Sequence, residues 1–74
     1  MNLTNAIEGM EYTIQDIRTN DEEMDAFLFS LGCYPGGKIT VITRLKKSCV
    51  VAIKDSRYSI DRQLAETILI NATK

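Results

Sequence analysis

The stretch LGCYPGG, residues 31–37, constrains the fold of this chain more than any other, because it gathers the residues that interrupt regular structure. It holds the only proline and three of the four glycines. Gly32 suits the left-handed backbone that ends a helix, and Pro35 prevents any continuation. Pro35 also suits the first corner of a turn, and Gly36 suits the positive φ that follows. We therefore expect a rigid corner that joins a helix to a strand.

An amphipathic segment precedes this corner. Apolar residues recur at i, i+3, i+4 and i+7 and predict one buried helical stripe, formed by Met24, Phe27, Leu28 and Leu31. Thr19 with Glu22 fits a capping box, and Asn20 with Glu23 could serve in the same way one residue later. The first turn of this helix is acidic, with Asp21, Glu22, Glu23 and Asp25. We interpret these carboxylates as complements of the exposed helix amides rather than as ligands of a cation.

The remaining segments read as short strands. Residues 11–17 alternate apolar and polar side chains with one shift before Ile17, which predicts a first strand. Leu3 and Ile7 precede it, and we expect both side chains to pack into one end of the core. After the corner, turns separate three β-rich runs, KITVITR, SCVVAIK and RYSI. Asp61 can cap a short helical turn through Glu66, and residues 68–70 have the β-branched character of a closing strand.

The number and length of these segments limit the architecture. A chain of 74 residues forms one domain, expected over residues 1–74, and buries only about 60% of the surface that its unfolded state exposes. Five short strands and one helix cannot cover both faces of a flat sheet, whereas a sheet closed on itself loses its exposed edges. We expect a mainly β fold: a small SH3-like barrel of about five strands, one α-helix between the first and second strands, and a short helical turn before the last.

Composition and sequence pattern argue against several classes of function. Ten acidic and nine basic residues argue against nucleic acid as the main partner. No segment approaches the ~18 apolar residues of a membrane span, and the N-terminus lacks the pattern of a secretory signal, so we expect a cytoplasmic protein without membrane insertion. Histidine is absent, and Cys33 and Cys49 read as buried hydrophobes, so we expect neither a metal site nor a cofactor. No catalytic motif appears, and we expect no enzyme.

Several of these segments together resemble the ferrous iron transport protein A (FeoA) family. The run LFSLGCYPGGKITVI has the family's helix, its LG and PG corner and the apolar strand that follows. The run YSIDRQLAETILI is similar to the family's closing segment, with Ile60, Ala65, Ile68 and Ile70 at the matching places. This resemblance implies a small cytoplasmic accessory protein of bacterial ferrous iron uptake. Such a protein would dock on the cytoplasmic GTP-binding domain of the membrane transporter and modulate it, rather than carry iron.

Candidate contacts with a partner follow from position and residue type. Phe29 lies off the helical stripe yet is large and apolar, and Tyr34 lies on the adjoining corner, so together they could anchor a partner. Lys46 and Lys47 occupy a hairpin tip, where they either keep strand edges unpaired or act as an electrostatic docking point. The candidate partner-binding residues are Phe29, Cys33, Tyr34, Pro35, Lys46 and Lys47.

Two other functions stay open beside the accessory role. One is an SH3-like barrel that binds nucleic acid, and the other is a barrel that binds a protein unrelated to iron. A groove for proline-rich peptides is disfavoured because the chain has no tryptophan. Self-association through the barrel edges is also open.

Overall fold

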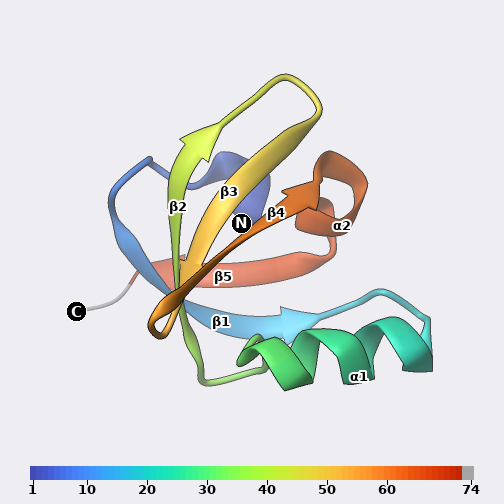
Figure 1. The fold of residues 1–74 in the computed structure, drawn as a ribbon. Helices are drawn as coiled ribbons and strands as arrows, with labels where there is room; N and C mark the ends of the chain where they lie inside the picture. Colours follow the sequence, from blue (N-terminus) through green and yellow to red (C-terminus); the bar gives the residue numbers. More distant parts are fainter. Residues whose placement is uncertain (73–74) are drawn as a thin grey trace.

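The structure, a computed structural model, describes residues 1–72. Its elements follow in the order η1 (Leu3–Asn5), β1 (Glu11–Ile17), α1 (Glu22–Leu31), β2 (Lys38–Arg44), β3 (Ser48–Ile53), β4 (Ser56–Asp61), α2 (Arg62–Glu66) and β5 (Ile68–Ala72) (Figure 1). The mainly β fold class is confirmed, with one helix between the first two strands and a short helix before the last.

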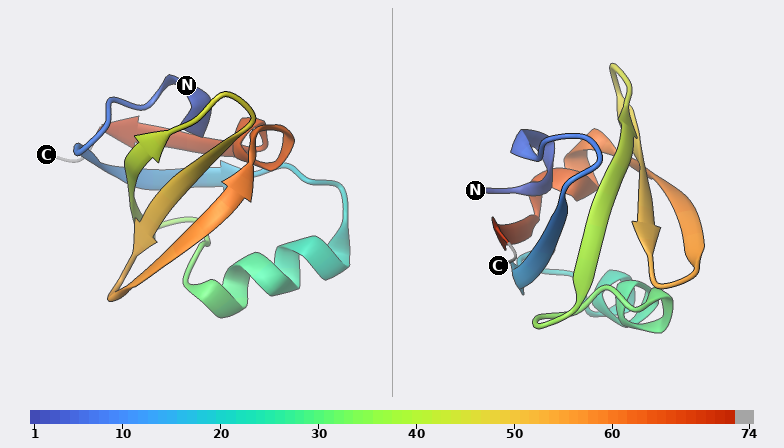
Figure 2. Two further views of the ribbon diagram at one scale, coloured as in Figure 1. Left: turned by 45° about the horizontal axis from the view of Figure 1, so that its top comes forward. Right: turned by 90° about the vertical axis from the view of Figure 1, so that its left-hand side faces the viewer.

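The strands of residues 1–72 form one five-stranded antiparallel sheet in the order β4-β3-β2-β1-β5. The register shifts between Ile14 and Asp16 in β1, and between Val41 and Thr43 in β2. Such bulges bend a strand and increase its twist, so the sheet curls. Figure 2 shows β2, β3 and β4 crossing over β1 and β5 instead of continuing their plane. The predicted shift before Ile17 is confirmed by the bulge in β1.

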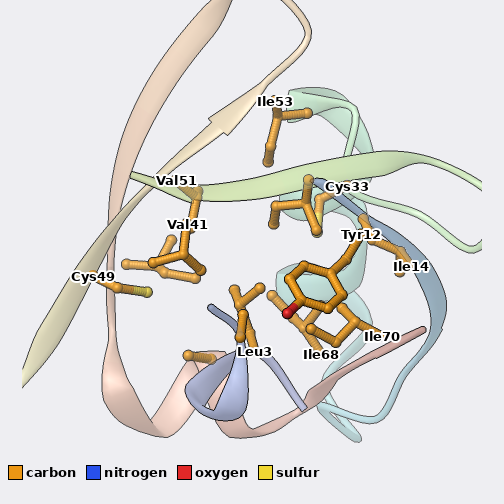
Figure 3. Close-up of a cluster of buried hydrophobic side chains, with 14 of the residues drawn as sticks. Leu3, Tyr12, Ile14, Cys33, Val41, Cys49, Val51, Ile53, Ile68 and Ile70 are labelled. Carbon is orange, nitrogen blue, oxygen red and sulfur yellow. The ribbon is translucent and has the colours of Figure 1, made fainter. Parts of the chain in front are cut away.

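The core fills the inside of this curl (Figure 3). Its largest fully buried side chains come from η1, α1, the corner after α1, and strands β1, β2, β3 and β5: Tyr12, Leu3, Ile14, Leu28, Ile39, Ile68, Ile70, Val41, Val51 and Cys33. The hydroxyl of Tyr12 accepts a hydrogen bond from the amide of Ile7 at 3.0 Å, so this buried polar atom has its partner. The side chain of Ile7 is 64% exposed, and its predicted place in the core was wrong, whereas Leu3 is fully buried.

The start of α1 differs from the sequence prediction. Asp21 is the N-cap, and its Oδ1 accepts hydrogen bonds from the amides of Glu23 at 3.0 Å and Met24 at 3.1 Å. The Thr19 hydroxyl instead accepts from the amide of Asp21 and donates to Asp25, so it orders the preceding loop. The capping-box prediction was wrong, because a carboxylate two residues later satisfies the free helix amides.

The predicted apolar stripe of α1 is only partly buried. Leu28 is 1% exposed and Met24 packs against the core, but Phe27 is 54% exposed. Figure 1 shows α1 lying outside the barrel below β1, and the same arrangement is visible in Figure 2. The helix therefore contacts the core along a narrow line and leaves most of its surface available.

Candidate functional site

The corner after α1 forms as the sequence predicts. Gly32 ends the helix with a φ of 95°, and Gly36 has a φ of 93° in the turn that follows. The amide of Gly37 donates to the carbonyl of Tyr34 at 2.9 Å and closes that turn. Two further backbone hydrogen bonds of 2.8 Å join Ile14 of β1 to Gly36 and Gly37. These bonds fix the corner against the sheet, so it holds the neighbouring side chains in place.

Phe29 and Tyr34 meet on the surface beside this corner. Their ring centroids lie 5.1 Å apart with an interplanar angle of 40°, a separation at which aromatic rings attract each other. The Nζ of Lys54 lies 5.7 Å from the centroid of the Tyr34 ring, within the range of a cation–π contact. Phe29 is 65% exposed. The structure brings together the two aromatic residues that the sequence singled out, and their binding of a partner stays a prediction.

A groove of about 190 Å³ runs beside the aromatic pair. We call it the α1 groove, and it is lined by Asp16, Ile17, Asp25, Phe29, Cys33, Tyr34 and Pro35. The guanidinium of Arg18, 3.1 Å from Asp16, and the amide of Ile17 hold the pKa of the Asp16 carboxyl below its usual value. Asp16 is therefore ionised at neutral pH. The groove combines an apolar aromatic surface with carboxylates.

Cys33 also lines the α1 groove, but almost none of its side chain reaches the molecular surface. Its side chain is 1% exposed, and burial raises the pKa of its thiol from 9.0 to about 11. Burial leaves little of the Cys33 side chain for direct contact, and its role in binding a partner stays a prediction. Cys49 on β3 is also buried, and burial raises its pKa as well. The interpretation of both cysteines as buried hydrophobes is confirmed.

Alkylation tests the burial of the two thiols. The thiolate is the reactive form, and burial both shields the sulfur atoms and raises their pKa. At pH 8 and 25 °C we expect iodoacetamide to label the folded chain at least roughly a hundredfold more slowly than the chain unfolded in guanidinium chloride. Mass spectrometry of timed samples measures both rates. Fast labelling of Cys33 in the folded chain would contradict its burial.

Lys46 and Lys47 lie apart from the α1 groove. They occupy the exposed tip of the β2–β3 hairpin, and Figures 1 and 2 place that tip at the opposite end of the molecule from α1. The structure therefore divides the predicted contact residues into two groups that cannot bind one small surface together. A docking role for the lysines stays a prediction.

A further cationic side chain, Arg62, lies at the hairpin tip, and sequence reasoning did not predict its place there. The amide of Arg62 in α2 donates to the carbonyl of Lys47 at 2.9 Å, which holds α2 against the hairpin. Arg62 lines a hollow of about 110 Å³ with Arg44 and Lys46. No signal in the sequence indicates that residue 62 meets residue 47, because the contact depends on how β4 returns along β3.

The described part of the chain contains few groups suited to other chemistry. Among residues 1–72, no group of three or more histidine, cysteine, aspartate and glutamate side chains could hold a metal ion. In the same range, neither α1 nor α2 has the length and apolar character needed to cross a membrane.

This fold, with a helix between the first two strands of a curled sheet and a short helix before the last, matches a known family of proteins. The family model described as FeoA domain covers residues 1–72. The chain belongs to the FeoA family. No curated protein matches this FeoA chain by sequence.

Solved structures share the fold of this FeoA chain. An iron uptake regulatory protein (FeoA) gives a TM-score of 0.87 at 19% identity, over 99% of this chain and 97% of that chain. The iron(II) transport protein A of Clostridium thermocellum gives 0.88 at 19% identity, over 99% of this chain and 46% of that chain. The FeoA of Stenotrophomonas maltophilia, solved with zinc and described as an SH3 domain protein, gives 0.81 at 14% identity, over 96% and 89%. The likeness confirms the SH3-like fold.

Proposed function

We propose that this FeoA chain is a small accessory protein of bacterial ferrous iron uptake. It acts on the cytoplasmic side, where it docks on the GTP-binding domain of the transporter and modulates it. Membership of the FeoA family supports the accessory role. Two structures of the same fold are described as an iron uptake regulatory protein and an iron(II) transport protein, which agrees with this role.

The observation that carries the docking proposal is the aromatic surface of the α1 groove. Phe29 is 65% exposed. Full burial of a phenylalanine side chain stabilises a protein by roughly 1.5–3 kcal/mol, and most of this stabilisation is not realised within the free chain. Phe29 stacks on Tyr34, and backbone hydrogen bonds of the corner hold Tyr34 against β1. A rigid exposed aromatic pair is the kind of anchor that dominates protein interfaces, because little conformational freedom is lost on binding.

The charge beside the pair indicates which partner surface fits. Asp16 and Asp25 line the groove, and α1 also carries Glu22 and Glu23, so these carboxylates outnumber the two nearby cations, Arg18 and Lys54. A basic surface on the transporter domain would complement this side of the molecule and speed the encounter. We therefore expect the association rate to fall as the salt concentration rises.

Removal of both aromatic rings tests the docking. Phe29→Ala combined with Tyr34→Ala should weaken binding to the isolated GTP-binding domain of the cognate transporter at least roughly tenfold, because both rings lose their buried contact. Calorimetric titration measures the affinity. The melting temperature should change little, since Phe29 is 65% exposed and Tyr34 is only half-buried.

The matched control is Ile7→Ala, because Ile7 is 64% exposed and does not line the α1 groove. This variant should bind as the wild type does. Equal affinities of the wild type and the double variant would remove the α1 groove from the contact. Absence of any binding by the wild type would remove the docking itself.

A further inference from the structure

Strand β4 leaves one edge of the sheet open. It pairs with β3 along its whole length, from Ser48 opposite Asp61 to Ile53 opposite Ser56, without a bulge. Within residues 1–72, no strand pairs with the other edge of β4. An open edge presents a row of backbone N–H and C=O groups that can pair with another strand.

The opposite edge of the sheet is covered by the chain itself. Asn2 forms a β-bridge with Leu69 of β5, and the amide of Ile70 donates to the carbonyl of Met1 at 3.0 Å. The N-terminal segment therefore occupies the outer side of β5. Of the devices that usually protect an edge strand, β4 has neither a proline nor a bulge, and its charged side chains are Arg57 and Asp61.

In the sequence of β4, SRYSID, the residues two positions before and two positions after Ser59 carry opposite charges: Arg57 and Asp61. In an antiparallel pair of two copies with Ser59 on the two-fold axis, Arg57 lies opposite Asp61 of the second copy. The symmetry repeats this pair on the other side of the axis. Moving the axis by one residue toward the N-terminus places Arg57 opposite serine, and the charge pairing is lost. Charge complementarity thus selects one register.

Both charged side chains are available for this pairing. Arg57 and Asp61 are exposed, and they lie on the same outer face of β4 because side chains alternate along a strand. Among residues 1–72, Arg57 takes part in neither of the salt bridges, which join Arg18 to Asp16 and Arg62 to Glu66. Asp61 uses its Oδ1 to accept a hydrogen bond from the amide of Leu64 at 2.7 Å, and within residues 1–72 its Oδ2 accepts none.

We propose that β4 is a self-association site at which a second copy of this chain adds its own β4 in antiparallel orientation, with Ser59 on the two-fold axis. Backbone hydrogen bonds continue the sheet from one copy into the next, and two Arg57–Asp61 pairs fix the register. The assembly ends at a dimer because the N-terminal segment covers β5 in both copies. A strand of six residues offers less area than a standard interface, so the dimer is weak and depends on concentration.

A cysteine on the axis tests this proposal. In Ser59→Cys the two new sulfur atoms would lie opposite each other, where directly paired side chains have Cβ atoms about 5 Å apart. Under mild oxidation we expect the disulfide-linked dimer to form at least roughly tenfold faster than in Thr43→Cys, a control on the exposed face of β2. Native Cys33 and Cys49 are buried and do not compete.

Charge reversal gives a second measurement that needs no new cysteine. Arg57→Glu replaces two attractive cross-strand pairs by two repulsive ones and should weaken wild-type dimerisation roughly tenfold, as measured by sedimentation equilibrium up to about 1 mM. The same change should slow cross-linking of Ser59→Cys. Equal cross-linking of Ser59→Cys and Thr43→Cys would overturn the proposal. A wild type that stays monomeric throughout, or a dimer indifferent to Arg57→Glu, would also overturn it.

Discussion

Leu28→Ala should destabilise the fold by roughly 3 kcal/mol, a large part of the free energy of unfolding of so small a chain. Leu28 is the one residue of α1 that is fully buried, with 1% of its surface exposed. Its truncation removes apolar contact and leaves a cavity between the helix and the barrel, which surrounding side chains fill only in part. Urea titration followed by circular dichroism measures the loss.

Phe27→Ala is the matched control for this prediction. Phe27 is the preceding residue on the same helix and a larger apolar side chain, but it is 54% exposed. Its loss should cost less than about 1 kcal/mol, because only part of the ring leaves water on folding. If both variants lost the same stability, α1 would be packed by its whole predicted stripe and not by Leu28 alone.

The difference between these two residues shows where the sequence pattern stops being informative. Periodicity correctly predicts that residues 22–31 form a helix, and it places Phe27 and Leu28 on the same stripe. It does not say how closely the helix approaches the barrel. That distance depends on how the corner at Gly32 and the bulge of β1 together place the helix against the sheet, which is a property of the whole fold.

The glycine and proline residues that end or turn regular structure were the most reliable signal in the sequence. Gly32, Pro35 and Gly36 predicted the corner because few residue types tolerate a positive φ or end a helix so sharply. The alternation of apolar residues also predicted the strands, since only one face of each strand packs inward. The corner and the strand faces were predictable because each depends on the residue types of a short segment and not on its tertiary contacts.

The candidate site was predictable only in part. Phe29 and Tyr34 are five residues apart across the corner, and the structure places their rings next to each other, while their anchoring of a partner stays a prediction. The separation of Lys46 and Lys47 from them depends on the direction of the β2–β3 hairpin, which is a property of the whole sheet. The burial of Cys33 was expected for its residue type, so its inclusion among the contacts conflicted with that expectation.

Gly32→Ala should also destabilise the fold severely, by roughly 2–3 kcal/mol, because two separate costs add. The φ of 95° at this position lies in the left-handed region, which costs a residue with a side chain about 1 kcal/mol or more. A Cβ there would also approach Cγ2 of Ile53 to 3.0 Å, and Ile53 is itself buried in the core on β3. Thermal unfolding and urea titration both measure the result.

Gly36→Ala separates these two costs. Gly36 has nearly the same φ, 93°, but a Cβ added there meets no atom within 4 Å. This variant therefore carries the backbone cost alone and should lose about 1 kcal/mol. The excess loss in Gly32→Ala then measures how tightly the end of α1 is pressed against β3. If the two variants lost the same free energy of unfolding, the Ile53 side chain would move aside at no measurable cost. The position of the corner would then depend on the turn and on its hydrogen bonds to Ile14 alone.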